Sequence, residues 1–481
     1  MCNPISRRKF LGQASCAAVG GTTLLSSVMN LGAIGTLAAR PHIIGNSGDY
    51  KAMVCILLAG GADSYNMLVP TEASEYAEYQ ASRGSLALDE TNQLLALDYD
   101  NNGRTFAVNS AMTAARDMFD AGDLSFISNI GTLIEPIANK AEYDSGLKKL
   151  PLGLYSHSDQ IMHWQTSVPQ TRSAVGFAGR VADMLQDMNS IPEVSMNISL
   201  DGKNRFQAGQ MGNEFSIGNN ATENSIGFTN FPSWWNNSGY INLQKNNAID
   251  SLAQQEYINV FEKTMGSLTK GAIESNEIFK TAFQKLVPLT STFSDTRLSQ
   301  DMKKMAEIIS LQSELGANRQ IFFTTYGGWD HHDNVIDNQN NMLPVLTNAM
   351  AEFNTAMEAL GMKENVVTFT ISDFARTLTT NGNGSDHAWG GNNMIMGGPV
   401  NGGQIFGNYP SLSLASDLNL SNRGRTLPTT SVDEFYAELA LWFGASPNDL
   451  DYILPNLCNF YSTTGCPADV PAGYSPLGLF S

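Results

Sequence analysis

Histidine is scarce in this chain, and four of the histidines lie beside or close to acidic residues. There are six among 481 residues. Asp330-His331-His332-Asp333 and Asp386-His387 place imidazoles next to carboxylates, and His157 lies in the polar run Ser156-His157-Ser158-Asp159-Gln160. Mixed oxygen and nitrogen donors of this kind suit a divalent metal, which allows a bound water or a serine to ionise near neutral pH. The pattern therefore predicts metal-dependent chemistry.

Three acidic residues follow apolar runs of strand length, namely Asp63, Asp330 and Asp373. In open α/β sheets, ligands bind outside the carboxyl ends of the strands, so these carboxylates are expected to converge there. Asp63 follows Gly60-Gly61, and the roles of metal ligand and turn cap are equally compatible with that position.

The paired histidines cannot both face one site. Adjacent side chains on an extended chain point in opposite directions, so one of His331 and His332 is expected to be a bystander, with Asp330 and His332 as the favoured pair. His387 lies in the polar, glycine-rich segment 383–391, which favours a functional role over a core position. His163 follows His157 by six residues, which is not the same face of a helix, so a packing or surface role is expected for it.

Ser156 and Ser158 stand at the start of a predicted helix that runs toward Trp164. Serines at this position are most often caps, and that interpretation is favoured. A serine there is also well placed to be a nucleophile, because the free N–H groups and the helix dipole favour an anion.

The first residues have the form of an export signal. Arg7-Arg8-Lys9-Phe10-Leu11 precedes a mildly apolar stretch from Ala14 to Ala39, and no acidic residue occurs before Asp49. A basic start, an apolar middle and a small-residue end indicate a twin-arginine signal peptide over residues 1–38, with the mature protein periplasmic or secreted.

The charge of the chain excludes some partners. The formal net charge is −18, and removal of the signal, with its three basic residues and no acid, makes it −21. So acidic a protein is not expected to bind nucleic acid, because it cannot neutralise a run of phosphates. No later segment has eighteen consecutive apolar residues, so the mature chain is expected to have no membrane span.

Three cysteines remain after the signal. Cys458 and Cys466 close a short loop, and a disulfide between them is favoured in an oxidising compartment. Cys55 lies in the apolar run Met53–Leu58 and is expected to be a buried strand residue.

The elements that must position these residues alternate between strands and helices, which indicates an α/β fold. The apolar pattern predicts strands over 54–58, 124–130, 321–325 and 366–371, and helices over 110–121, 176–186 and 342–360. Ser431 with Glu434 predicts a capping box for a helix that runs to Phe443. Residues 39–481 are expected to form one domain, with a helical and irregular insertion at about 201–312 that covers one edge of the sheet.

The chain resembles the bacterial family called domain of unknown function 1501, which belongs with the alkaline-phosphatase and sulfatase-like superfamily. The motifs that carry this resemblance are Leu58–Asp63, Ser156–Gln160, Gly328–His332, Ser372–Thr377, Ser385–Gly391 and Thr429–Glu434. The resemblance implies an alkaline-phosphatase-like three-layer α/β sandwich with a central, mostly parallel sheet.

The resemblance also implies roles for single residues. Asp63, Asp330, His332, Asp373 and His387 correspond to the metal ligands of the superfamily. Ser156 or Ser158, with His157 nearby, corresponds to the nucleophile at a helix start, and Arg376 could position the anion. The superfamily enzymes have Asp followed by His where this chain has Asp373-Phe374. One divalent metal (zinc, manganese or calcium) is therefore expected rather than two.

The leading hypothesis is an exported metal-dependent hydrolase of phosphate or sulfate esters, acting on a small anionic ester or on a sulfated or phosphorylated glycan. The alternative is a non-catalytic exported scaffold or glycan-binding protein with a degenerate hydrolase fold, in which Trp234 and Trp235 could supply a sugar-stacking surface. A redox protein is disfavoured, because neither paired reactive cysteines nor a dinucleotide-binding motif is present.

Overall fold

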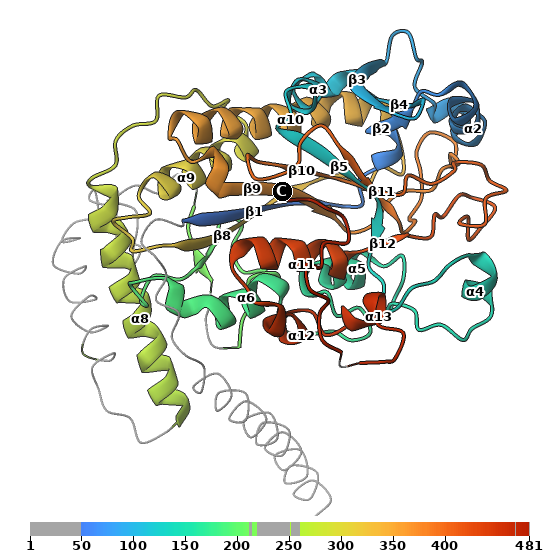
Figure 1. Ribbon diagram of the computed structural model, residues 1–481. Helices are drawn as coiled ribbons and strands as arrows, with labels where there is room; N and C mark the ends of the chain where they lie inside the picture. The colour runs from blue at the N-terminus through green and yellow to red at the C-terminus, as the bar shows by residue number, and fades with distance from the viewer. Residues whose placement is uncertain (1–49, 211–213, 219–250, 252–259, 467, 481) are drawn as a thin grey trace, which may run out of the picture. The chain divides into compact units, whose positions relative to one another are not determined.

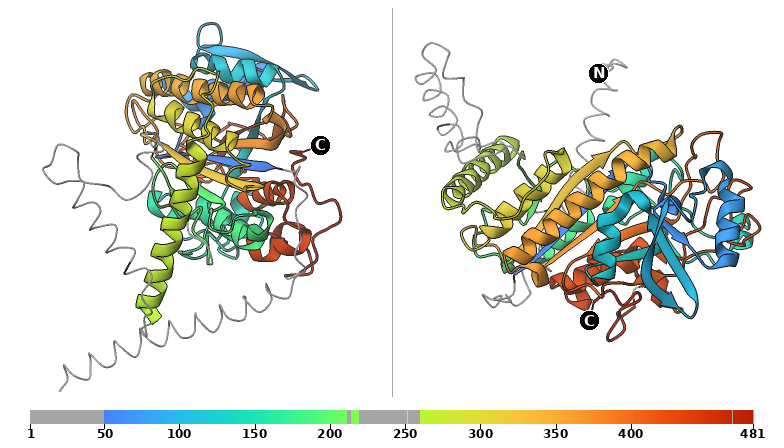
Figure 2. Two further views of the ribbon diagram at one scale, coloured as in Figure 1. Left: turned by 90° about the vertical axis from the view of Figure 1, so that its left-hand side faces the viewer. Right: turned by 90° about the horizontal axis from the view of Figure 1, so that it is seen from above.

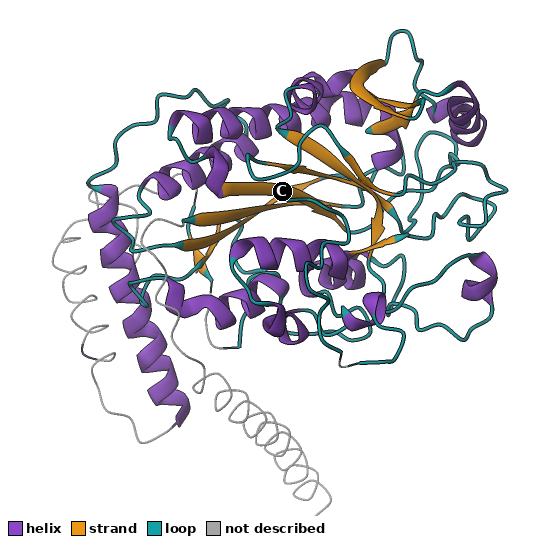
Figure 3. Ribbon diagram, viewed as in Figure 1, coloured by secondary structure: helices purple, strands orange, loops and turns teal. Residues whose placement is uncertain are grey.

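Two layers of helices cover the two faces of a central sheet (Figures 1 and 3). This computed structural model describes residues 50–210, 214–218, 251, 260–466 and 468–480, without the side chains of 260–269. The strands of the sheet are β1 (Lys51–Ala59), β5 (Leu124–Gly131), β6 (Asn197–Ser199), β7 (Phe215–Ser216), β8 (Arg319–Gly327), β9 (Val366–Ser372), β10 (Gly391–Met396), β11 (Ile405–Gly407) and β12 (Thr430–Ser431).

The order across the sheet is β11–β5–β10–β9–β1–β8–β6–β7, and β12 pairs with β5. Strand β10 is antiparallel to both β5 and β9, and the other pairs are parallel. The predicted α/β class with a mostly parallel central sheet is confirmed.

The helices form one layer on each face of the sheet (Figures 1 and 2). One layer holds α3 (Thr113–Asp120), α9 (Arg297–Ser310) and α10 (Val335–Ala359). The other holds α5 (His157–Thr166), α6 (Phe177–Leu185), α11 (Val432–Phe443), α12 (Leu450–Ile453) and α13 (Cys458–Tyr461). Outside these layers lie α4 (Lys140–Asp144), α8 (Val260–Phe283), and a small antiparallel sheet of β2 (Leu68–Pro70), β3 (Leu94–Asn101) and β4 (Arg104–Asn109) with α2 (Ala73–Arg83).

Strand β1 shows why the sheet needs both layers. Its alternate residues belong to two different hydrophobic clusters, with Val54 and Ile56 in one and Cys55 and Leu57 in the other. A parallel strand buried on both faces is a nearly continuous apolar run, and β1 is apolar from Ala52 to Ala59. Cys55 is a fully buried strand residue, as predicted.

The other predicted elements agree closely with β5, β8, β9, α3, α6 and α11. Helix α10 is the exception, since it begins at Val335 and not at Met342. Its first turns are rich in Asn, Gln and Asp and lack apolar periodicity, which is why the sequence pattern placed the start too late. Strands β10, β11 and β12 were not predicted, because they are short or rich in glycine and asparagine.

The proposed insertion at 201–312 divides between different parts of the structure. Strand β7 extends the edge of the sheet beside β6, whereas α9 contributes Met302 and Met305 to the core and packs beside α10. Trp234 and Trp235 lie outside the described residues, as does the proposed signal peptide. Among the described residues, no helix is long and apolar enough to cross a membrane.

A buried acid lies in the first turn of α11. Ser431 and Glu434 form the predicted capping box, and burial raises the pKa of the neighbouring Asp433 to about 8. A carboxyl group whose pKa is raised on folding destabilises the folded state as pH rises from about 4 toward 8.

We expect Asp433→Asn to raise the free energy of unfolding at pH 8.5 by about 1–3 kcal/mol and to change it little at pH 4. Urea unfolding at both pH values measures this. Asp451→Asn, which changes an exposed acid, is the control, and an equal effect at both pH values contradicts the prediction.

The C-terminal segment is cross-linked. Cys458 and Cys466 form a disulfide, which confirms that prediction. The free energy of unfolding of the double variant Cys458→Ser/Cys466→Ser is expected to be about 2 kcal/mol lower than that of the native protein, because the disulfide restricts the unfolded chain. Thermal unfolding with and without reductant checks this: the native protein should lose stability when reduced, and the variant should not respond.

Candidate metal centre

The carboxyl ends of three adjacent parallel strands meet at one edge of the sheet. Leu58 of β1 lies opposite Tyr326 of β8 on one side and Ser372 of β9 on the other. The segments that follow these strands therefore leave the sheet side by side. The first residue of α5, His157, is brought to the same place, and so is the loop before β10 that carries His387.

Four side chains gather at this edge. The Nε2 atom of His332 lies 3.1 Å from Oδ1 of Asp330, and that of His387 lies 3.4 Å from the same oxygen. The Nε2 atom of His157 lies 3.4 Å from Oδ2 of Asp330, and the Nε2 atoms of His332 and His387 are 3.0 Å apart. We call these four residues the cluster. Ligand atoms of His157, Asp330 and His387 all lie within 4.8 Å of one another, a spacing that could hold a metal ion.

Each imidazole of the cluster is fixed through its other nitrogen. In all three rings Nδ1 faces an acceptor oxygen: Asp373 Oδ2 at 2.7 Å from His157, Asp386 Oδ1 at 3.2 Å from His332, and the backbone oxygen of Tyr155 at 2.8 Å from His387. An acceptor at Nδ1 stabilises the tautomer that carries its proton there, so the lone pair lies on Nε2. Carboxylates and carbonyls in this outer position are typical of histidines that bind metal.

The charge state of the cluster suits a cation. Burial lowers the pKa of His387, against the opposing effect of the Tyr155 carbonyl. Burial works to raise the pKa of Asp330, but the Arg376 guanidinium and the histidines outweigh it and hold that pKa below its usual value. At neutral pH the cluster therefore contains an ionised carboxylate and a neutral His387.

Arg376 lies next to the cluster but is fully buried. Its Nη1 atom is 2.9 Å from Oδ1 of Asp330, which makes an ion pair. Its backbone forms an isolated bridge with that of His387. The structure places the charge of Arg376 against the carboxylate of Asp330, and its role in positioning an anion stays a prediction.

Asp63 is not part of the cluster. It is fully buried and forms an ion pair with Arg83 of α2 at 2.7 Å. The hydroxyl of Ser385 donates a second hydrogen bond to the same oxygen. The structure thus joins Asp330, His332 and His387 from the predicted ligand set, puts Asp373 behind His157 as an outer partner, and leaves Asp63 in a separate pair.

Two further histidines of the described residues, His331 and His163, are buried. His331 packs against Trp329, with ring centroids 5.9 Å apart, and burial lowers its pKa. His163 is fully buried, and burial lowers its pKa to about 4. Both observations agree with the role of bystander given to one histidine of the pair and the packing role given to His163.

The two serines flank His157 without capping the helix. Ser156 occupies the N-cap position of α5, but its side chain accepts no hydrogen bond from the first turn. Its Oγ lies 3.2 Å from that of Ser158, which is exposed. The cap interpretation favoured from sequence is therefore wrong for Ser156. Ser156 and Ser158 both remain candidates for the nucleophile.

Two glycines allow the segments of the site to approach each other. A Cβ atom on Gly60, whose φ is +120°, would lie 2.5 Å from the backbone nitrogen of Asp330. A Cβ atom on Gly384 would lie 2.2 Å from the backbone carbon of His332. Both contacts are far shorter than van der Waals distance, so side chains at these positions would push the ligand segments apart.

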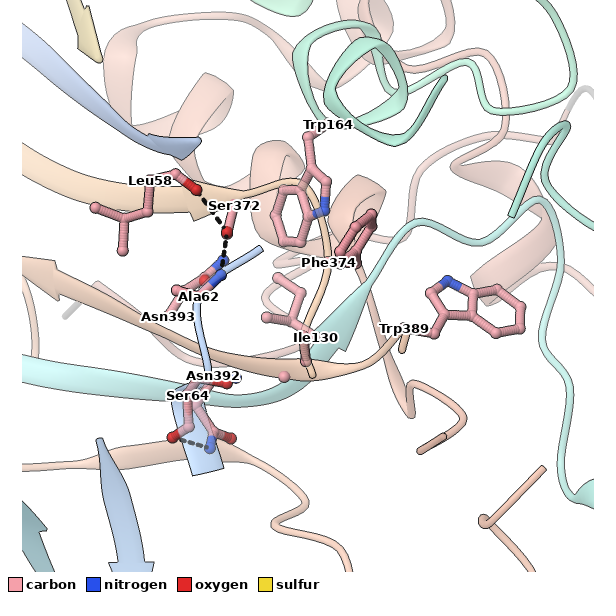
Figure 4. Close-up of a pocket in the computed structure, with 12 residues that line it drawn as sticks. Leu58, Ala62, Ser64, Ile130, Trp164, Ser372, Phe374, Trp389, Asn392 and Asn393 are labelled. Carbon is pink, nitrogen blue, oxygen red and sulfur yellow. Dashed lines mark hydrogen bonds between the residues drawn. The ribbon is translucent and has the colours of Figure 1, made fainter. Parts of the chain in front are cut away.

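Phe374 connects the cluster to the interior. Its ring lies 4.8 Å from that of His157 and 4.6 Å from that of His387. It also lines a small cavity among apolar and amide side chains, where Ser372 bridges the Leu58 carbonyl and the Ala62 amide (Figure 4). The lining residues carry no ionisable side chain, so this cavity is not the place where a metal would bind.

Some residues of the site had no usable sequence signal. Arg83 forms an ion pair with Asp63. The Tyr155 carbonyl faces the His387 ring, and Arg425 donates to the His387 backbone. Arg83 and Arg425 are single charges without a spacing pattern, and Tyr155 acts through its backbone. Asp386 stood beside His387 in the sequence, and its adjacency could have suggested an outer partner.

Comparisons with known proteins are consistent with the motif resemblance. Residues 294–449 match the family described as "Protein of unknown function (DUF1501)", which confirms the predicted family for that segment. None of the curated proteins matches the chain.

Several solved structures are similar to parts of this chain. The structure of Ps i-CgsB in complex with k-i-k-neocarrahexaose is 9% identical with a TM-score of 0.33, covering 83% of this chain and 74% of that one. The PsFucS1 sulfatase from Pseudoalteromonas sp. is 7% identical with a TM-score of 0.33, covering 83% and 68%. A mutant of alkaline phosphatase PafA is 13% identical with a TM-score of 0.23, covering 69% and 64%. Likenesses this slight carry no argument about activity.

Proposed function

We propose that this chain, whose residues 294–449 belong to the DUF1501 family, is an exported metal-dependent hydrolase of phosphate or sulfate esters. The single observation that best supports a bound metal is the distance of 3.0 Å between the Nε2 atoms of His332 and His387. Asp330 lies beside both atoms. Both rings face acceptors at Nδ1, and when each ring carries its proton there, two lone pairs and a carboxylate face one point. A cation there removes the repulsion between the lone pairs.

The donor set favours zinc among the expected metals. Tetrahedral ligands of zinc, bound at about 2.0–2.1 Å, lie about 3.4 Å from one another. The contacts of 3.0–3.4 Å that Asp330 and His332 make in the cluster are close to that spacing. Calcium requires six or more oxygen ligands, and a set rich in imidazole does not supply them.

The residues of the chain have distinct roles in the proposed reaction. Asp330 and the three imidazoles bind the metal, which when present supplies Lewis acidity and a lowered pKa for a coordinated oxygen. Asp373 orients His157 through Nδ1, and Arg376 holds the carboxylate of Asp330 ionised. Ser156 or Ser158 at the start of α5 is the proposed nucleophile, since the free N–H groups of a helix start favour the anionic group under attack.

The choice of ester rests on the motif resemblance and not on the geometry of the cluster. The cluster is open, with His332 46% and Asp330 45% exposed, so a substituent on a polymer could reach it as well as a small ester. Export through the twin-arginine route is part of the proposal, because that route carries folded proteins with their cofactors in place.

The test is metal analysis of the purified mature protein followed by assays on p-nitrophenyl phosphate and p-nitrophenyl sulfate. We expect one zinc ion per chain and hydrolysis of at least one ester, lost on chelation and restored by zinc. Ser156→Ala and Ser158→Ala, assayed separately, identify the nucleophile by loss of turnover with zinc still bound. A protein that binds no metal and leaves both esters intact contradicts the proposal.

A specific observation favours a second candidate, a non-catalytic scaffold. Asp63, the residue that resembles the first-strand ligand, is neutralised by Arg83, and a protonated His332 could donate to both Asp330 and Asp386. In that case the cluster is a closed ion-pair network. The free energy of unfolding of the protein would then fall in His332→Gln, and added zinc would not change the stability of the native protein.

A further inference from the structure

Tyr155 and Arg425, which lie far apart in the sequence, both contact His387 and also contact each other. The Nδ1 atom of His387 faces the backbone oxygen of Tyr155 at 2.8 Å. The Nε atom of Arg425 donates a hydrogen bond of 3.0 Å to the backbone carbonyl of His387. The guanidinium carbon of Arg425 also lies 4.0 Å from the centre of the Tyr155 ring. One arginine therefore joins the histidine to the residue that accepts its hydrogen bond.

Tyr155 has a backbone conformation that a tyrosine rarely adopts. Its φ is +70°, in the left-handed region, which costs a non-glycine residue about 1–3 kcal/mol. Such strain persists only where surrounding contacts compensate for it. Here the side chain packs against the hydrophobic cluster that contains Trp389, and Arg425 lies on its ring.

The turn at Tyr155 serves two ligands at once. Its carbonyl faces His387, and the chain continues directly through Ser156 into His157, the first residue of α5. A change in this turn would therefore move the acceptor of one imidazole and the backbone of another. Arginine suits the clamping position because its planar group can stack on an aromatic ring and donate hydrogen bonds in its plane, which a lysine cannot do.

We propose that Arg425 and Tyr155 are positioning residues, which fix the Nδ1–H tautomer and the orientation of His387 so that Nε2 faces Asp330. The consequence for catalysis rests on the proposed function. The effect on His387 itself does not, because every contact named above is made by the protein alone.

The experiment measures the tautomer of His387 in metal-free protein labelled with ¹⁵N-histidine. Long-range ¹H–¹⁵N spectra distinguish Nδ1–H from Nε2–H, and the variant His387→Gln assigns the signal. We expect Nδ1–H in the native protein and a mixture of tautomers in Arg425→Gln and Arg425→Lys. Zinc affinity, from competition with a chelator, should fall about tenfold in both variants. Arg172→Gln, which removes an exposed arginine paired with Asp159, should change neither reading.

Each outcome decides the proposal. A native tautomer in Arg425→Gln overturns it, and so does an equal shift in Arg172→Gln. A tautomer shift in a protein that binds no zinc supports the positioning role and contradicts the proposed function. If Arg425→Gln does not fold, Tyr155→Asn replaces it, since asparagine tolerates a left-handed φ and keeps the carbonyl but removes the ring under Arg425. That variant should show the same mixture, and a native tautomer in it overturns the proposal.

Discussion

Asp330→Ala is expected to raise the Kd for zinc by more than a hundredfold and to abolish ester hydrolysis. Asp330 lies within 3.4 Å of all three imidazole Nε2 atoms of the cluster, so its removal takes away the carboxylate that faces them. Chelator competition and steady-state kinetics with both aryl esters measure the two effects.

The same variant is expected to lose stability. Arg376 would remain buried without the carboxylate that now lies 2.9 Å from it. Because Asp330 is itself partly exposed, we expect a loss of about 1–3 kcal/mol, less than for a fully buried pair. Asp337→Asn, an exposed acid at the start of α10, is the matched control. Zinc affinity within twofold of native in Asp330→Ala would show that the cluster does not bind the metal.

Asp373→Asn is expected to weaken zinc binding by about 10–100-fold, although Asp373 does not belong to the cluster. Its Oδ1 accepts the Gly60 N–H at 3.0 Å and its Oδ2 faces His157 Nδ1 at 2.7 Å. An amide can keep the first contact, but its NH₂ group then faces Nδ1. His157 would have to move its proton to Nε2, which removes the lone pair that the metal needs.

A comparison between two outer carboxylates sharpens that prediction. Asp373 is fully buried, whereas Asp386, which faces His332, is 30% exposed and also pairs with Arg423. Water can replace part of the contact that Asp386 makes, so Asp386→Asn should have the smaller effect on zinc affinity. Equal affinities in the native protein and in Asp373→Asn would contradict the assigned role of Asp373.

The fold could be predicted from the sequence because its strands are strongly patterned. Strands β1, β5, β8 and β9 are apolar runs that end at glycine or polar residues. Strands β9, β1 and β8 are neighbours in the centre of the sheet, and β10 joins β5 to them. The short pieces at the edges, such as β11 and β12, depend on pairing with β5. Their sequences carry no period of their own, so only the assembled sheet defines them.

The site could be predicted in part for a similar reason. Asp330 and Asp373 follow β8 and β9, the two parallel neighbours of β1, so the topology of the sheet brings them to the same edge. The pairing of Asp63 with Arg83 could not be foreseen, because Arg83 stands at the end of α2 as a single charge that belongs to no motif. His157 was predicted as the neighbour of a nucleophile. Its contact with Asp330, which makes it a candidate metal ligand, depends on where α5 begins.

The central claim is that His157, Asp330, His332 and His387 form one metal centre. Anomalous X-ray diffraction at the zinc edge, from crystals of the mature protein grown with one equivalent of zinc, tests it most directly. The expected result is a single strong peak within about 2.0–2.2 Å of the histidine Nε2 atoms and the Asp330 carboxylate. A peak beside other residues, or none, would contradict it.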